Sequence, residues 1–273
     1  MKKRQQLQLF VRSLFLQTGW NYTKFQNLGL AFAMWPVLER LYNKDKDALP
    51  SVLNRYLEVF NTQPYMASFC LGTFARQEEL IAQANTLTEF NERVTEWGGL
   101  KRALSITAAS IGDRLFWGTL KPFTLLVALV IWLAMGVNFF DIPLSQNPNL
   151  GKMLAAAAAA FCVFNGVALF IRWQGLRLSY ESDGEHCYGL TCFDWNKTIY
   201  HAKKWGLIST ILTILFGFYC YLKAFSPLQV HFLTRAVLVI SFIMISFIAR
   251  RLRIPTMYLY LGAMVVLNLV CYF

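Results

Sequence analysis

The sequence predicts an all-α integral membrane protein. We expect an amphipathic and re-entrant helical N-terminal region, 1–121, followed by about five transmembrane helices in a second region, 122–273. Of the 273 residues, 56% are hydrophobic and 15% are charged, whereas charged residues make up roughly a quarter of an ordinary soluble domain. In addition, apolar runs close to the roughly 20 residues that a bilayer span requires fill the C-terminal half.

Basic residues also favour a membrane protein. The formal net charge is +11, and many Lys and Arg residues lie between apolar runs, as in the cytoplasmic loops of membrane proteins. A nucleic-acid-binding protein would instead gather them on a soluble face or arm. Trp and Tyr recur near the ends of the apolar runs, where interfacial belts place them. We therefore expect no nucleic-acid partner.

The first predicted helix lies at the N-terminus. Apolar residues from Leu7 to Phe15 recur at helical spacing, with Arg4, Gln8 and Arg12 among them, which predicts an amphipathic helix. One interpretation places this helix on the membrane surface, with its basic residues toward the headgroups. The other has it packed on the rest of the protein, and the two are compatible.

Two further apolar segments of the N-terminal region are too short to span. Residues 28–38 are interrupted by Pro36, which disfavours a continuous helix. Residues 60–72 form the second such segment, and we expect both to enter the membrane without crossing it. Residues 85–99 are polar and predict a soluble helix that ends at its closing pair of glycines, Gly98–Gly99.

Five apolar runs of spanning or nearly spanning length follow. Lys and Arg are frequent before the first run, in the loop after the second run (counted from Arg172) and in the last loop, and they are sparse elsewhere. Because cytoplasmic loops carry the excess of positive charge, this alternation predicts a cytoplasmic N-terminus and an external C-terminus. The expected spans are 122–140, 151–171, 205–225, 232–249 and 255–273.

Uncharged polar residues precede the second half-length segment. Asn61, Thr62 and Gln63 stand between the aromatic residues Phe60 and Tyr65. One interpretation is a helix cap made by Asn61 or Thr62. The other is a re-entrant tip that faces a solute, because amide and hydroxyl groups beside aromatic rings suit a neutral polyol such as a sugar.

Gln26 and Asn27 precede the first half-length segment in a matching position. These two side chains are candidates to face the same cavity as the polar residues before the second segment. The alternative is polar packing inside the protein, where buried amides need hydrogen-bond partners.

Residues 111–122, IGDRLFWGTLKP, stand immediately before the first apolar run. Ionisable side chains at membrane depth are costly and usually mark a pathway or a paired site. Backbone that leaves the helix at this depth must be buried in protein or line a watery cavity. We expect Asp113 to fix a re-entrant bend or to accept a sugar hydroxyl, in a hydrogen bond that its charge strengthens. Equally, Asp113 can cap a helix or pair with Arg114 or a nearby Lys.

No residue pattern indicates catalysis, a metal site or a cofactor. His186 shares a polar loop with Cys187 and Cys192, but their spacing matches no strong zinc pattern. His201 and His231 also lie in or beside polar loops, without a nucleophile and base, and no phosphate-binding glycine loop is present. We therefore expect a protein that is not an enzyme. The N-terminus lacks the pattern of a signal peptide.

Three segments together resemble a known family. Residues 12–42, 60–72 and 111–122 are similar, in order and spacing, to the IID component of mannose-type sugar phosphotransferase systems, which serve mannose, fructose, sorbose and N-acetylgalactosamine. Three motifs in register make the resemblance specific. The chain departs from the family at 106–110, where glycine and proline are usual, and at Arg114, where proline is usual. The shared frame in the third segment is Gly112, Asp113, Phe116, Trp117, Gly118, Thr119 and Pro122.

This resemblance implies a sugar permease subunit in the bacterial inner membrane. Family members pair with a IIC subunit of related fold and inverted topology, the pair trimerises, and sugar binds between the two cores. Soluble IIA and IIB units carry phosphate on histidines, IIB phosphorylates the emerging sugar, and IID has no phosphorylation site of its own. The departures leave open a divergent IID-like scaffold or regulatory protein that no longer transports. The candidate sugar-binding residues are Gln26, Asn27, Asn61, Thr62, Gln63 and Asp113.

Overall fold

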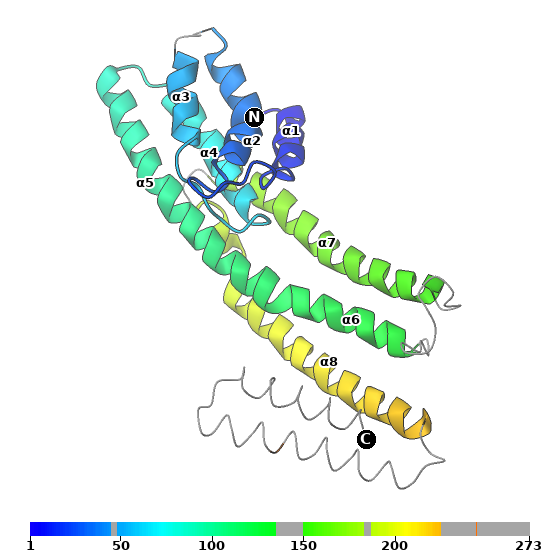
Figure 1. The fold of residues 1–273 in the computed structure, drawn as a ribbon. Helices are drawn as coiled ribbons and strands as arrows, with labels where there is room; N and C mark the ends of the chain where they lie inside the picture. Colours follow the sequence, from blue (N-terminus) through cyan, green and yellow to red (C-terminus); the bar gives the residue numbers. More distant parts are fainter. Residues whose placement is uncertain (45–47, 135–149, 183–186, 225–243, 245–273) are drawn as a thin grey trace. The chain divides into compact units, whose positions relative to one another are not determined.

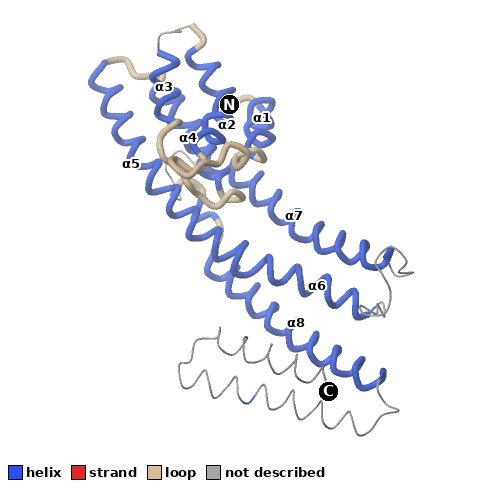
Figure 2. The backbone as a smooth tube through the Cα atoms, viewed as in Figure 1, coloured by secondary structure: helices blue, strands red, loops and turns tan. Residues whose placement is uncertain are grey.

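Helices make up the regular structure of the chain. A computed structural model describes residues 1–44, 48–134, 150–182, 187–224 and 244 (Figures 1 and 2). Within these ranges no β-strand forms, and the only extended pairings are isolated bridges that join Phe25 to Asn21 and to Phe60. The helices are α1 (Lys3–Ser13), α2 (Asn27–Tyr42), α3 (Ala48–Tyr56), α4 (Ala67–Ile81), α5 (Leu87–Gly112), the π-helix η1 (Asp113–Leu120), α6 (Lys121–Ala134), α7 (Leu150–Glu181), the short 3-10 helix η4 (Leu190–Cys192) and α8 (Trp195–Ala224).

The chain forms two units, Met1–Thr213 and Ile214–Phe273. The first unit contains every residue of the candidate site, and the second begins inside α8. The predicted organisation into regions 1–121 and 122–273 stays a prediction.

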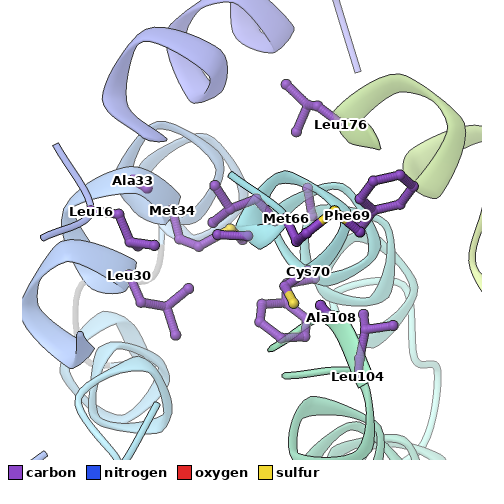
Figure 3. Close-up of a cluster of buried hydrophobic side chains, with 14 of the residues drawn as sticks. Leu16, Leu30, Ala33, Met34, Met66, Phe69, Cys70, Leu104, Ala108 and Leu176 are labelled. Atoms are coloured by element: carbon purple, nitrogen blue, oxygen red, sulfur yellow. The ribbon is translucent and has the colours of Figure 1, made fainter. Parts of the chain in front are cut away.

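Helix α4 is the centre of the first unit. It packs against α2, α5 and α7, and every residue from Ala67 to Ala75 is buried. A helix that is surrounded by neighbours in this way must be apolar or small on all faces. Figure 3 shows Met66, Phe69 and Cys70 at the start of α4 among side chains of the surrounding helices. The labelled neighbours are Leu30, Ala33 and Met34 of α2, Leu104 and Ala108 of α5, Leu176 of α7, and Leu16.

Small residues bring α4 and α7 into close contact. A Cβ added at Gly175 of α7 would lie 2.8 Å from the Ser68 Oγ, and one added at Gly72 of α4 would lie 2.0 Å from the Ser179 Oγ. Both pairs advance along the two helices together, so α4 and α7 run in the same direction. Each helix therefore contributes two small residues four positions apart, an arrangement that lets membrane helices approach closely.

One continuous helical rod crosses the boundary between the predicted regions. Residues 87–132 form a 46-residue stretch, built from α5, η1 and α6, that is long and apolar enough to cross a membrane. The predicted end of a soluble helix at Gly98–Gly99 is therefore wrong, because α5 continues through both glycines. Nothing lies within 4 Å of a Cβ added at either position, so these glycines are surface positions of a helix rather than a break.

The expected exit from the helix within 111–122 is also not observed. Gly112 ends α5, and Asp113–Leu120 continues as a π-helix, in which the Thr119 hydroxyl donates to the Arg114 carbonyl (2.8 Å). A π-helix adds a residue to the turn without breaking the backbone hydrogen bonding. Residues 106–110 contain neither glycine nor proline, so the part of α5 that directly precedes Gly112 has no strong helix breaker.

The two half-length helices are too short to span a bilayer, as predicted, but α2 is longer than the segment 28–38, and α4 begins and ends later than the segment 60–72. Helix α2 has 16 residues and α4 has 15, which is shorter than the roughly 20 residues of a bilayer span. The predicted interruption at Pro36 is wrong, because α2 runs through this residue. Helix α1 confirms the predicted N-terminal helix: Leu9 is buried against the core, while Leu7 and Val11 stay 54% and 44% exposed.

Helix α7 has the properties of a lipid-facing span. It is 32 residues long, and only 17% of its most apolar window is buried inside the protein, so large side chains such as Phe161 and Phe170 point outward. Helix α6 packs along it, and the Trp132 indole donates to the Met153 carbonyl (3.1 Å). The predicted span 205–225 coincides with α8 up to Ala224. The predicted spans 232–249 and 255–273 lie outside the described residues, apart from Met244.

Candidate functional site

The segment from Phe60 to Met66, which we call the tip segment, lies between the entrance to α2 and the end of α5. Its first residue is held by backbone pairing: the Gln26 N–H donates to the Phe60 carbonyl (2.9 Å). The neighbouring Phe25 adopts a φ of +58°, which is a strained conformation for a bulky residue. Two backbone hydrogen bonds with Asn21 hold it there (2.9 and 3.0 Å). Such strain persists only where surrounding contacts impose it, and it is concentrated at functional sites.

Gln26 binds the tip segment through its side chain. Its Oε1 accepts from the Thr62 N–H (3.0 Å), and its Nε2 donates to the Thr62 carbonyl (2.8 Å). Both groups are buried, so this pair satisfies backbone atoms that no helix or strand reaches. The Thr62 hydroxyl in turn donates to the carbonyl of Ser105 in α5 (3.0 Å). Gln26 and Thr62 therefore use their polar groups within the protein, which supports the packing interpretation for Gln26. The predicted helix cap by Asn61 or Thr62 is not formed, because Met66 is the N-cap residue of α4.

Asn27 also uses its amide within the protein. Its Nδ2 donates to the Leu57 carbonyl (2.9 Å), and its Oδ1 accepts from the Asn21 Nδ2 (2.8 Å). The side chain is 5% exposed. Asn27 thus fixes the segment after α3, which leads into the tip segment, against the start of α2.

The two polar atoms of the Gln63 side chain differ in their hydrogen bonding. Its Oε1 accepts from the backbone N–H of Tyr65 (2.6 Å) and of Met66 (3.3 Å), which caps the turn leading into α4. Its Nε2 is buried and has no hydrogen-bond partner among the described residues. The stem of Gln63 packs on Gly112, where an added Cβ would lie 2.5 Å from the Gln63 Cβ. Only glycine at position 112 allows this approach.

Asn61 and Asp113 are exposed at the edge of this contact. Asp113 directly follows Gly112, so the close packing of Gln63 on Gly112 places the start of η1 beside the tip segment. No side-chain hydrogen bond or ion pair of Asn61 or Asp113 occurs within the described ranges, and the alternative in which Asp113 pairs with Arg114 is not formed there. These two side chains and the Gln63 amide are therefore the groups of the predicted set with free hydrogen-bonding capacity.

Aromatic rings border the same place. The Tyr65 ring lies 4.7 Å from the Phe116 ring of η1 and 5.4 Å from the Phe164 ring of α7, measured between centroids. A polar edge beside aromatic rings can bind a polyol, because hydroxyl groups take the hydrogen bonds and C–H faces pack on accessible ring surface. The structure thus brings all six predicted residues into one region, four as buried supports and two as exposed groups.

Two contributors to this region were missed by the sequence analysis. Ser105 acts through its backbone carbonyl, for which no sequence pattern exists. Gly112 was named within the shared frame of the family, but its close packing against Gln63 was not predicted. Arg172 was counted as a loop charge, but it lies in α7 and is 4% exposed. A single cation at the end of an apolar run was the available signal.

A buried ionic network holds the opposite part of α4. The Glu78 side chain is 0% exposed, and it accepts two hydrogen bonds from Arg55 Nη2 (2.7 and 2.9 Å) and one from the Tyr42 hydroxyl (2.9 Å). Burial, together with the nearby Glu78 carboxylate, raises the pKa of Tyr42 well above its ordinary value. Tyr42 therefore remains a hydrogen-bond donor at neutral pH.

Glu79 forms a second pair beside it. Arg40 Nη2 and the Tyr180 hydroxyl both donate to its carboxylate. Burial alone would raise the pKa of Glu79, but the hydrogen bonds from Tyr180 and Arg40 outweigh it and lower this pKa below the usual value. The network joins α2, α3, α4 and α7 at the part of α4 that lies away from the candidate site.

The fold and the site define an all-helical membrane protein in which a polar tip segment is packed against a spanning helix. The sequence profile of the PTS system mannose/fructose/sorbose family IID component matches residues 1–209. The chain belongs to this family. The prediction of an all-α membrane protein and of the IID family is thereby confirmed.

Curated relatives agree with this assignment. The chain is 33% identical to the mannose-specific EIID component of Escherichia coli (strain K12) over 173 aligned residues. The aligned stretch covers 63% of this chain and 53% of the relative. The chain is 32% identical over 173 residues to the sorbose-specific EIID component of Klebsiella pneumoniae, covering 63% and 55%. It is 28% identical over 180 residues to the fructose permease IID component of Bacillus subtilis (strain 168), covering 66% and 57%. The chain therefore spans about half the length of the curated relatives it matches.

Solved structures share the fold. A cryo-EM structure of the mannose transporter ManYZ in complex with microcin E492 matches with a TM-score of 0.55 and 23% identity, over 100% of this chain and 96% of that one. A structure described as a membrane protein matches with a TM-score of 0.59 and 27% identity, over 77% of this chain and 68% of that one. The first likeness shows the fold alone.

Proposed function

We propose that this chain is the IID-type membrane subunit of a sugar phosphotransferase permease. It forms the translocation path together with a IIC-type partner, while a soluble IIB unit, charged by IIA, phosphorylates the sugar. The chain supplies no phosphorylation site of its own, and the complex is a hetero-oligomer with trimeric symmetry. It resides in the bacterial inner membrane with its N-terminus in the cytoplasm and its C-terminus outside, in line with the distribution of Lys and Arg.

One observation supports this proposal above the others. Three distant parts of the sequence meet at this place. Gln26 binds the backbone of Thr62, and the neighbouring Gln63 packs on Gly112, which directly precedes Asp113. Asn61, Asp113 and the Gln63 Nε2 keep their hydrogen-bonding capacity at this place. A neutral sugar of the mannose, fructose or sorbose type offers matching hydroxyl groups, and a charged acceptor such as Asp113 binds hydroxyls more strongly than a neutral one.

Uptake of labelled sugars tests the proposal. Cells that lack their own mannose-type system would receive this chain with IIC, IIA and IIB subunits. We expect Asp113→Asn to raise the half-saturation concentration by about tenfold or more, since a hydrogen bond to a charged group contributes about 1.5–3 kcal/mol. Asn61→Ala should weaken uptake to a smaller extent. Membrane insertion of both variants should stay normal, because both side chains are exposed.

Matched controls separate the site from general surface effects. Glu96→Gln changes an exposed carboxylate of α5, and Asn54→Ala changes an exposed amide of α3. Both should leave uptake unchanged. Normal uptake by Asp113→Asn and Asn61→Ala would refute the site assignment.

A second function is supported by the residues that differ from the family. Residues 106–110 form a regular part of α5, and Arg114 is exposed beside Asp113. A divergent IID-like scaffold would still assemble with its membrane partner but would move no sugar. Co-purification of a IIC partner without uptake of labelled mannose, fructose or sorbose would favour this second function over transport.

A further inference from the structure

Arg172 is a buried cation without a carboxylate partner. It lies in the C-terminal part of α7 and is 4% exposed, and no acidic side chain in the described ranges forms an ion pair with it. Burial of an unpaired charge is costly. Other groups must therefore offset the charge of this guanidinium.

The end of α1 provides the first such group. Arg172 Nη1 donates to the backbone carbonyl (2.5 Å) and to the hydroxyl (3.1 Å) of Ser13, the last residue of α1. The last carbonyls of a helix lack partners within it and carry partial negative charge, so a cation at this place is favourable. The contact joins α1 to α7, and its two residues are 159 positions apart in the sequence.

The tip segment provides the second group. The Arg172 guanidinium lies over the Tyr65 ring, 5.6 Å from its centroid, which is an attractive cation–π geometry. The backbone N–H of Tyr65 is the donor that holds the Gln63 Oε1 at 2.6 Å. The side chain of Arg172 is thus linked through one residue to the amide that carries the unpaired Nε2.

We propose that Arg172 is a positioning residue, which fixes Tyr65 and thereby orients the Gln63 amide toward the candidate sugar site. The Gln63 Oε1 is held by the short bond from the Tyr65 N–H and by a longer one from the Met66 N–H (3.3 Å), and these bonds fix the direction of the unpaired Nε2. If Tyr65 shifts, the amide loses the shorter of its two anchors and its orientation changes. The consequence for sugar affinity depends on the proposed function, whereas the positioning of the tip segment depends on the structure alone.

Cysteine labelling tests the positioning without transport. In a chain whose six cysteines are replaced by Ala, Thr62→Cys places a buried thiol in the tip segment, since Thr62 is 4% exposed. Arg172→Met keeps the volume but removes the charge. We expect it to accelerate maleimide labelling at position 62 by about threefold or more, in proportion to the lost cation–π contact. Arg177→Met, a cation of the same helix that is half exposed and paired with Glu181, should leave the rate unchanged.

Two further variants keep the test decisive if Arg172→Met fails to insert. Arg172→Lys retains a charge that reaches Ser13 but lacks the planar group that stacks on a ring, and it should give an intermediate rate. Tyr65→Leu leaves α1 and α7 intact and should match Arg172→Met. The double variant should add nothing to either single one, because both remove the same contact. Labelling rates that stay at the wild-type value in Arg172→Lys and Tyr65→Leu would overturn the inference.

Uptake kinetics distinguish positioning from a purely structural role. We expect Arg172→Lys to raise the half-saturation concentration for sugar at an unchanged maximal rate per inserted protein. A structural role would instead lower the amount of inserted protein and leave the half-saturation concentration as it is, which would contradict positioning. If labelling responds as expected but the wild-type chain with its partners takes up no sugar, the positioning role stands and the proposed function fails.

Discussion

Gly72 of α4 lies directly against Ser179 of α7, where an added Cβ would be 2.0 Å from the Ser179 Oγ and 2.4 Å from the Leu176 carbonyl oxygen. A separation of this kind leaves no room for any side chain. Together with the contact between Ser68 and Gly175, it attaches a helix too short to cross a membrane to one that is long enough. The backbones of α4 and α7 come close to each other because each small residue of one helix faces a small residue of the other.

This contact makes Gly72→Ala a sharp test of the packing. The added methyl group meets the α7 backbone, which cannot move as a flexible side chain can, so we expect a loss of about 1–3 kcal/mol in the free energy of unfolding. The measurement is the thermal unfolding of the purified protein in detergent. Gly166→Ala is the matched control: nothing lies within 4 Å of its added Cβ, and helix propensity should make it neutral or stabilising by about 0.5–1 kcal/mol. Equal stability of both variants would refute the described contact.

Removal of the buried carboxylate of Glu78 should destabilise the protein strongly. Glu78→Gln leaves Arg55 without its counter-charge, and breaking one partner of a buried pair costs about 3–5 kcal/mol. Glu181→Gln removes one partner of an exposed pair with Arg177 on α7 and should cost less than about 1 kcal/mol. Denaturation midpoints of the two variants compare the pairs directly. A loss for Glu78→Gln as small as for Glu181→Gln would contradict the burial of this pair.

The pH dependence of stability should report Glu79. Its pKa is lower in the folded protein, because Tyr180 and Arg40 donate to the carboxylate and outweigh the effect of burial. A depressed pKa contributes stability that is complete above the unfolded value, about 4.3, and is lost as the pH falls through the folded value. The wild-type melting temperature should therefore fall below about pH 5, and that of Glu79→Gln should fall less steeply. Parallel curves for the two proteins would show that Glu79 is not the responsible group.

Thiol reactivity should separate Cys70 from the exposed cysteines. Burial raises the pKa of the Cys70 thiol to about 12, and the thiolate is the reactive form. Iodoacetamide at pH 8 should thus modify Cys187 and Cys192, which are exposed, and leave Cys70 unmodified until the protein is denatured. Mass spectrometry of proteolytic peptides measures each site. Modification of Cys70 in the native protein at the rate of Cys192 would show that α4 is not a core helix.

Loss of the side-chain bond between Gln26 and the tip segment should weaken the fold locally. Gln26→Leu leaves the buried N–H and carbonyl of Thr62 without partners, at a cost of about 1–3 kcal/mol for each unsatisfied group. Hydrogen exchange at the Thr62 amide should accelerate accordingly. Gln8→Leu, at an exposed position of α1, should leave this amide protected. Unchanged exchange at Thr62 in Gln26→Leu would contradict the assigned hydrogen bonds.

The sequence alone determined the class of protein and the position of the polar motifs. Composition, apolar run lengths and the placement of Lys and Arg are local properties, and a bilayer imposes its constraints on single segments. For this reason the membrane class, the helix at Leu7–Phe15 and two helices too short to span, α2 and α4, were predictable, although the exact ends of these helices were not. The three motifs in register identified the family on the same basis.

Only the tertiary structure decided what each polar residue does. Gln26 and Thr62 are 36 residues apart and Thr62 and Ser105 are 43 residues apart, and no local pattern predicts which backbone group a side-chain amide or hydroxyl will bind. The same is true of Gly112 and Gly72, whose function is the absence of a Cβ next to a neighbour. The sequence therefore named six candidates, and packing separated exposed Asn61 and Asp113 from four buried supports.

Residues 111–122 and Arg172 show where local inference fails. A re-entrant bend was predicted within 111–122, yet the helix continues because a π-helical turn accommodates the extra residue and keeps the backbone hydrogen-bonded. Arg172 was assigned to a loop by its charge, but the Ser13 carbonyl at the end of α1 and the ring of Tyr65 offset that charge inside the protein. Both outcomes depend on groups that come together only in the folded chain, which is why the sequence could place this polar region but not resolve its contacts.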